Sequence, residues 1–85
     1  GKNFAHPRRI RQQAAICAGN SGDRSLVPYL AALLAEDDPV LRTHAAWALG
    51  RLGGEAAKTA LLGALSAEQD EEVRREVESA LSTLR

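Results

Sequence analysis

This 85-residue chain is poor in several residue types, and each shortage excludes a class of protein. Its one cysteine, Cys17, excludes an internal disulfide and a cysteine-ligated zinc or iron–sulfur site. No apolar run approaches the ~20 residues that a membrane span needs. The chain has no methionine, three aromatic residues and zero net charge. A hydrophobic fraction of 45% is too high for disorder at that charge, so we expect one small folded domain in the cytoplasm.

The zero net charge is the sum of two unlike ends. Residues 1–22 carry basic side chains and no acidic one, whereas residues 68–78 are mainly acidic. Most of the basic residues are arginine, which forms paired hydrogen bonds to carboxylate or phosphate more readily than lysine does. The basic end therefore allows a local anion-binding face, although a solvated helix face explains the same pattern.

An internal repeat is the clearest pattern in the sequence. Residues 10–19 match residues 41–50, with Arg, Ala-Ala and Gly in the same places, and residues 73–81 continue the register. A second apolar segment, residues 30–34, matches residues 61–65 at the same spacing. A repeat of about 31 residues with two helix-periodic segments predicts stacked helical hairpins, an all-α solenoid.

Capping and stop signals set the expected helix boundaries. Asp38 and Asp70 are typical N-caps, Ser25 is a third candidate, and Gly53 with Gly54 is a typical stop. The expected helices span residues 7–18, 25–36, 39–52, 55–67 and 71–84. Apolar residues spaced along one helical face predict the buried side of the third helix: Leu41, Ala45, Ala48, Leu49 and Leu52.

The ends of the repeat array carry their own expectations. Residues 1–6 are expected to form a linker or disordered leader before a single domain of residues 7–85. A solenoid buries its faces between repeats, so an array of two and a half hairpins is expected to expose apolar surface at both ends. We therefore expect the chain to be part of a longer protein.

No group of residues predicts catalysis. The two histidines, His6 and His44, lack a nucleophile at motif spacing, and the acidic pair Asp37 and Asp38 falls where a helix start explains it. Cys17 lies among alanines and is expected to be a small buried thiol. We predict no catalytic, cofactor-binding or metal-binding residue, and hence no enzyme in this chain.

Residues that recur at the repeat period are expected to build the repeat. Arg11, Arg42 and Arg74 recur in this way. We expect these arginines to pair with carboxylates of the preceding turns, such as Asp38 or Asp70.

Residues that break the repeat are freer to serve function. His44, Trp47 and Arg51 lie at i, i+3 and i+7 on one helix, as suits base stacking and phosphate binding. Two alternatives stay open: Trp47 fills the groove between hairpins, and Arg51 is an ordinary surface arginine. With a basic track at the N-terminal end, the candidate nucleic-acid-binding residues are Arg8, Arg9, Asn20, His44, Trp47 and Arg51.

Two segments carry a family resemblance. The turn GNSGD at residues 19–23 and the string HAAWALGRLGG at residues 44–54 resemble the C-terminal HEAT-like region of epoxyqueuosine reductases. The likeness extends from about Arg9 to Leu84. It implies a parent enzyme that uses cobalamin and two iron–sulfur clusters to complete queuosine in the tRNA anticodon loop, an iron–sulfur cluster-binding protein with its catalytic domains N-terminal to this region.

The resemblance also implies a role for this chain. It is expected to be a non-catalytic HEAT-like module that helps dock the tRNA anticodon stem-loop, beside the N-terminal catalytic domains of the same polypeptide. The Arg-Asn pair of the family is replaced here by Gln12-Gln13, which changes any RNA contact at that point. The alternative is a HEAT-like scaffold for protein–protein interaction.

Overall fold

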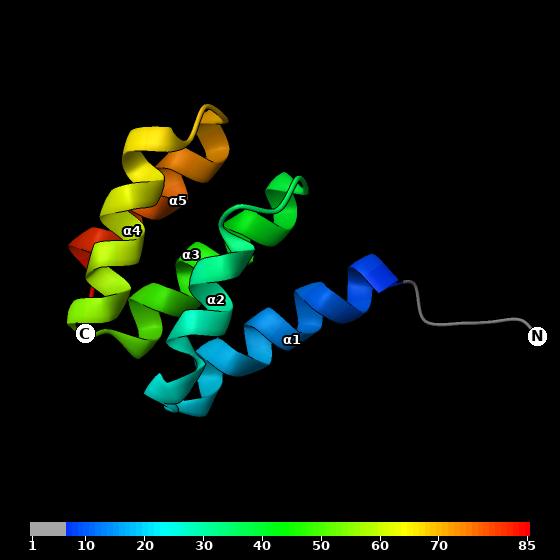
Figure 1. The fold of residues 1–85 in the computed structure, drawn as a ribbon, viewed down its shortest axis with the longest axis vertical. Helices are drawn as coiled ribbons and strands as arrows, with labels where there is room; N and C mark the ends of the chain where they lie inside the picture. The colour runs from blue at the N-terminus through cyan, green and yellow to red at the C-terminus, as the bar shows by residue number, and fades with distance from the viewer. Residues whose placement is uncertain (1–6) are drawn as a thin grey trace, which may run out of the picture.

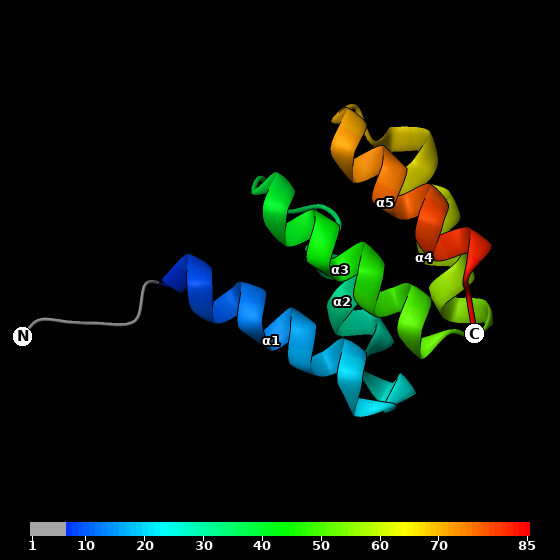
Figure 2. The same ribbon diagram turned by 180° about the vertical axis from the view of Figure 1, so that it is seen from behind.

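The computed structural model describes residues 7–85, so the expected leader of residues 1–6 lies outside the described residues. The described residues form helices joined by short turns, and none of them forms a strand. Its elements are α1 (Pro7–Ser21), the 3-10 helix η1 (Arg24–Leu26), α2 (Val27–Leu33), α3 (Pro39–Leu52), α4 (Glu55–Ala67) and α5 (Glu71–Ser82). Helices α1, α3 and α5 lie side by side in one layer, and α2 and α4 form the other (Figure 1 and Figure 2). This is the predicted α-solenoid.

The core is built from alanine, leucine and valine side chains between the two layers. The predicted buried face of α3 is confirmed, since its five residues are at most 4% exposed. Val73, Val77 and Ala80 complete the core from α5. Because many of these side chains are small, neighbouring helices approach closely.

Two glycines at equivalent repeat positions mark the closest helix crossings. A Cβ added at Gly50 of α3 would lie 2.9 Å from the Cβ of Ala80 in α5. A Cβ at Gly19 of α1 would lie 2.9 Å from the Cα of Ala48 and 2.7 Å from the Trp47 ring. Gly19 is therefore a packing residue and no helix stop, which is why α1 runs past the predicted end at residue 18.

The predicted N-caps are confirmed at two of three helices. The Asp38 carboxylate accepts from the Val40 N–H at 3.0 Å, and that of Asp70 accepts from the Glu72 N–H at 2.9 Å. The Ser25 prediction is wrong, because Asp23 provides the cap and accepts from both the N–H and the hydroxyl of Ser25.

Helix α2 ends at Leu33, three residues before the predicted end. The chain continues as a turn in which the N–H groups of Leu34, Ala35 and Glu36 donate to carbonyls three residues earlier. The carbonyls of Glu36 and Asp37 are then free to accept from the Arg42 guanidinium, at 2.8 and 3.0 Å. Helix α5 also stops early, at Ser82 instead of residue 84, with Thr83 as its C-cap.

The two terminal faces differ from each other. At the first, the expected apolar surface is present, with Ile10 and Tyr29 exposed. Cys17 is exposed there too, so the prediction of a buried thiol is wrong. Its repeat equivalent Ala48 is buried by α1, and within residues 7–85 no helix packs on Cys17 in that way. At the second face, α5 exposes Glu78 and Ser82, so the expected apolar surface is lacking on that helix.

Candidate nucleic-acid interface

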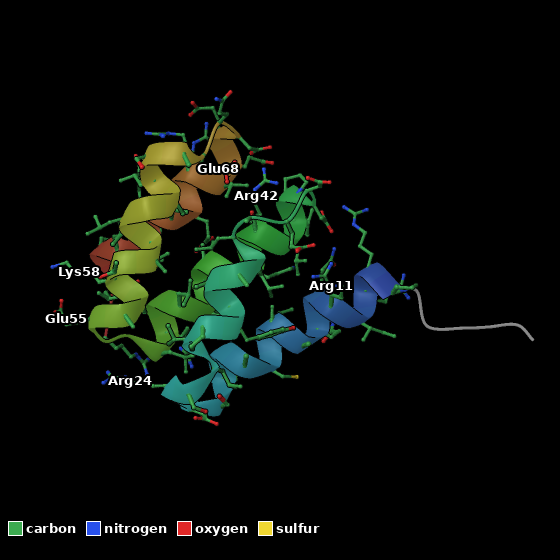
Figure 3. All side chains as sticks on the ribbon, in the orientation of Figure 1. Arg11, Arg24, Arg42, Glu55, Lys58 and Glu68 are labelled. Carbon is green, nitrogen blue, oxygen red and sulfur yellow. The ribbon has the colours of Figure 1, made fainter. Side chains whose placement is uncertain are left out.

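The recurring arginines join successive repeats. The Arg42 Nε and Nη2 donate to the two carboxylate oxygens of Glu68 at 2.9 and 3.0 Å, and the pair is largely buried (Figure 3). Arg11 makes the equivalent bond to Glu36 at 2.9 Å. Arg74 instead donates to the carbonyls of Leu65 and Glu68. Burial raises the pKa of Glu68, but the hydrogen bonds from Arg42 and from the Asp70 N–H, together with the Arg42 charge, outweigh burial and leave that pKa below its ordinary value.

The structural role predicted for these arginines is confirmed, but the predicted partners are wrong. Asp38 and Asp70 use their carboxylates to cap helices, and Glu36 and Glu68 at the hairpin ends accept hydrogen bonds from Arg11 and Arg42 instead. This assignment removes Arg11, whose partner is Glu36, from the basic side chains that are available to a ligand.

Arg8 is held by a carboxylate of the next repeat. Its Nε and Nη2 donate to the Asp38 carboxylate at 2.7 and 3.0 Å, and Gln12 adds a third bond at 3.3 Å. The Arg8 guanidinium is the main reason why the pKa of Asp38 lies well below its usual range. Arg8, Arg9, Gln12 and Val40 line a hollow of about 390 Å³ where α1 meets α3.

Three of the candidate residues, Asn20, Trp47 and Arg51, lie together near the C-terminal ends of α1 and α3. The Arg51 guanidinium carbon lies 5.5 Å from the centre of the Trp47 ring, within cation–π range. The Arg51 Nη2 also donates to the Asn20 side-chain oxygen at 3.4 Å, a long bond that joins α3 to α1. His44 lies one turn earlier on α3 and is half-buried, as Trp47 is.

A pocket of about 280 Å³ opens beside Trp47 and Arg51, between α3 and α5. Its lining residues include two arginines, two hydroxyl side chains and no acidic side chain; they are Trp47, Gly50, Arg51, Ser79, Ala80, Thr83 and Arg85. An arginine-lined pocket with one aromatic wall can hold an anion next to a flat ring.

Sequence reasoning missed part of this pocket. Thr83 is the repeat equivalent of Asn20 and Arg51, so the register already pointed to it. Arg85 gave no such signal because it follows the last helix. It reaches the pocket because its backbone N–H donates to the Gly50 carbonyl at 3.3 Å.

Apart from His44, which lies one turn before Trp47 on α3, the predicted site residues thus fall into two groups. Arg8 and Arg9 lie at the start of α1, whereas Asn20, Trp47 and Arg51 gather near the ends of α1 and α3. The rise of an α-helix separates Arg9 from Asn20 by about 17 Å. A ligand that contacts both groups must therefore be longer than a single nucleotide.

Other kinds of site are not supported by the described residues. No three His, Cys, Asp or Glu side chains of residues 7–85 come together in a way that could hold a metal ion. The single cysteine gives no ligand set for an iron–sulfur cluster. No helix of the described chain is long and apolar enough to span a membrane.

The HEAT-repeat family matches residues 5–82. This chain belongs to the HEAT-repeat family. The HEAT domain is 36% identical over 77 residues to the epoxyqueuosine reductase of Bacillus subtilis, which covers 89% of this chain and 20% of that protein. It is 39% identical to an uncharacterized protein in the gldA 3′ region of Geobacillus stearothermophilus, covering 89% of this chain and 36% of that one.

A solved structure of an epoxyqueuosine reductase contains the same fold. The crystal structure of a selenomethionine-labelled epoxyqueuosine reductase matches the HEAT domain with a TM-score of 0.82 and 36% identity, over 91% of this chain and 21% of that chain. The resemblance predicted from the sequence is therefore confirmed. This chain spans about a fifth of the reductases and about a third of the Geobacillus protein that it matches.

Proposed function

We propose that this HEAT domain is a non-catalytic module that docks RNA on the layer formed by α1, α3 and α5. The ligand we propose is the anticodon stem-loop of a tRNA, presented to the catalytic domains of an epoxyqueuosine reductase-like protein in the cytoplasm. Arg51 and Arg9 would hold phosphates, with Asn20 and His44 as polar contacts. Trp47 would pack against a sugar or base.

One observation carries the proposal: the pocket beside Trp47 is lined by Arg51 and Arg85 and by no acidic side chain. The cation–π contact orients the Arg51 guanidinium without neutralising it. Its long bond to Asn20 is neutral on the amide side, so a phosphate can replace it at little electrostatic cost. Arg8 makes a weaker candidate, because a phosphate would compete with the Asp38 carboxylate.

The likeness to epoxyqueuosine reductases supports the choice of ligand. An iron–sulfur cluster of such an enzyme would be bound outside residues 7–85, because these residues contain a single cysteine. This HEAT domain would then contribute affinity and orientation for the RNA, and the chemistry would take place elsewhere in the protein.

A matched pair of charge reversals tests the proposal. Arg51→Glu and Lys58→Glu change the net charge equally, but Lys58 is exposed on α4 in the other layer (Figure 3). Binding of an anticodon stem-loop RNA is measured by fluorescence anisotropy at several salt concentrations. We expect Arg51→Glu to weaken binding roughly 10-fold and to lower the salt slope by about 1, and Lys58→Glu to change affinity less than about 3-fold.

Two results would contradict RNA docking: binding that does not depend on salt, or equal losses in the two variants.

The second candidate function, a scaffold for a protein partner, draws on the exposed side chains of Ile10 and Tyr29. It predicts binding of a protein that is insensitive to salt and unaffected by Arg51→Glu.

A further inference from the structure

The outer face of the first hairpin, on the side away from α3, is an apolar surface that nothing within residues 7–85 covers. Ile10 and Tyr29 are 53% and 42% exposed on it. Between α1 and α2 lies a shallow hollow of about 510 Å³ with no charged side chain in its lining, which consists of Ala14, Cys17, Ala18, Ser21, Leu26 and Tyr29.

The repeat register identifies the kind of surface that covers such a hollow. Shifted by 31 residues, the six lining residues become Ala45, Ala48, Leu49, Leu52, Ala57 and Ala60 of the second hairpin. Five of these are at most 4% exposed, and Ala60 packs against the core, because α1 and α2 lie over them. The outer face is therefore the same interface, one repeat earlier.

A second copy of this chain does not suit the face. Stacked head to tail, α5 of one copy would take the place that α1 has against α3. Glu78 and Ser82 of α5 would then occupy the positions of Ala15 and Gly19, which are buried in that interface. Burying the Glu78 carboxylate against an uncharged hollow is costly, and Ser82 adds a Cβ where the helices need glycine.

We propose that this face binds a preceding helical hairpin of the same repeat type, from the same polypeptide in a longer protein. Its inner helix would cross α1 at Cys17 and present glycine there, as Gly19 does to Ala48 and Gly50 does to Ala80. The matched reductases are about 4.5 times the length of this chain and have room for such a hairpin. The inference is independent of RNA binding.

The reactivity of the Cys17 thiol measures whether this face is covered, because Cys17 lies in the hollow. In an extended protein, residues 1–7 are replaced by a second copy of residues 39–70, joined directly to Arg8. The copy of Gly50 then lies 30 residues before Cys17, the same interval that separates Gly50 from Ala80 in the original chain. The reaction rate of Cys17 with Ellman's reagent is measured in the folded state. We expect a fast reaction in the original chain and a reaction at least ~100-fold slower in the extended one, because the thiol becomes buried.

The matched control carries leucine in place of the added glycine, so that the added helix cannot approach α1. We expect Cys17 to react in it as in the original chain. Equal rates in the extended protein and this control would overturn the proposal. Slow reaction of the original chain at high concentration, with dimers in sedimentation velocity, would also overturn it in favour of a second copy.

A second pair of variants keeps the test decisive if the extended chain aggregates. Ala14→Glu and Ala45→Glu place a carboxylate at equivalent positions of the first and second hairpins in the original chain. We expect Ala45→Glu to abolish cooperative unfolding and Ala14→Glu to leave the unfolding midpoint nearly unchanged. Equal damage from both would show that the first face is already covered, and the proposal would be wrong.

Discussion

The crossing at Gly50 allows a sharp test of the packing argument, through the substitution Gly50→Ala. The new Cβ would lie 2.9, 3.0 and 3.1 Å from the Cβ, Cα and carbonyl oxygen of Ala80. Two of these atoms belong to the backbone, so α3 and α5 must move apart. Overpacking of this kind costs about 1–3 kcal/mol, and the better helix propensity of alanine returns about 1 kcal/mol. We expect a net loss of about 0–2 kcal/mol.

Gly63→Ala provides the control, because this helical glycine is exposed and has nothing within 4 Å of the added Cβ. Propensity alone acts there, and we expect a gain of about 0.5–1 kcal/mol. For a domain of this size, 1 kcal/mol shifts the thermal midpoint by about 4–8 °C. Thermal and urea unfolding followed by circular dichroism separate the two variants. If Gly50→Ala proves as stable as Gly63→Ala, the close crossing is refuted.

Three further predictions concern polar contacts. The free energy of unfolding should fall below about pH 4, because folding lowers the pKa values of Asp38 and Glu68. The stability that these two carboxylates contribute is complete above their pKa values in the unfolded chain. It is lost as the pH falls through their pKa values in the folded protein. Asp38→Asn keeps a capping oxygen and should reduce this acid loss in urea titrations from pH 3 to 7; an unchanged pH profile would contradict the assignment. Asp70→Ala should cost about 1 kcal/mol in urea unfolding by removing the α5 cap, whereas Asp70→Asn should cost little. Arg24→Met should lower the free energy of unfolding, measured in urea, by about 1–2 kcal/mol, because the Arg24 Nε donates to the Leu52 carbonyl at 2.8 Å. No loss would mean that solvent replaces this bond.

The architecture could be predicted from the sequence because its cause is periodic. A 31-residue repeat with helical spacing specifies the hairpins, and the buried face of α3 follows from the same spacing. The errors at helix ends have local causes. Glycine marks both helix stops and helix crossings, and the chain alone does not say that Gly19 is a crossing while Gly22, with φ +74°, is the stop.

Contacts between repeats were harder to predict than the repeats themselves. Arg42 was expected to find an aspartate, yet Glu68 has the longer side chain and Asp70 already caps α5. The exposure of Cys17 depends on which hairpin precedes α1, and its immediate neighbours in the sequence carry no information about that. The approach of Arg51 to Trp47 could be expected from their spacing, whereas the return of Arg85 to Gly50 could not.

The unequal burial of the two arginine–glutamate pairs bears on the order in which the molecule opens. The Arg42 and Glu68 side chains are 17% and 7% exposed, but those of Arg11 and Glu36 are 47% and 42% exposed. Water screens an exposed pair more strongly, and α1 buries fewer apolar side chains than α3. In a solenoid each repeat contacts only its neighbours, so an end repeat has one stabilising interface where an inner repeat has two. Amide protons of α1 should therefore exchange first, and the chain should unravel from its first helix toward a more persistent unit of α3, α4 and α5.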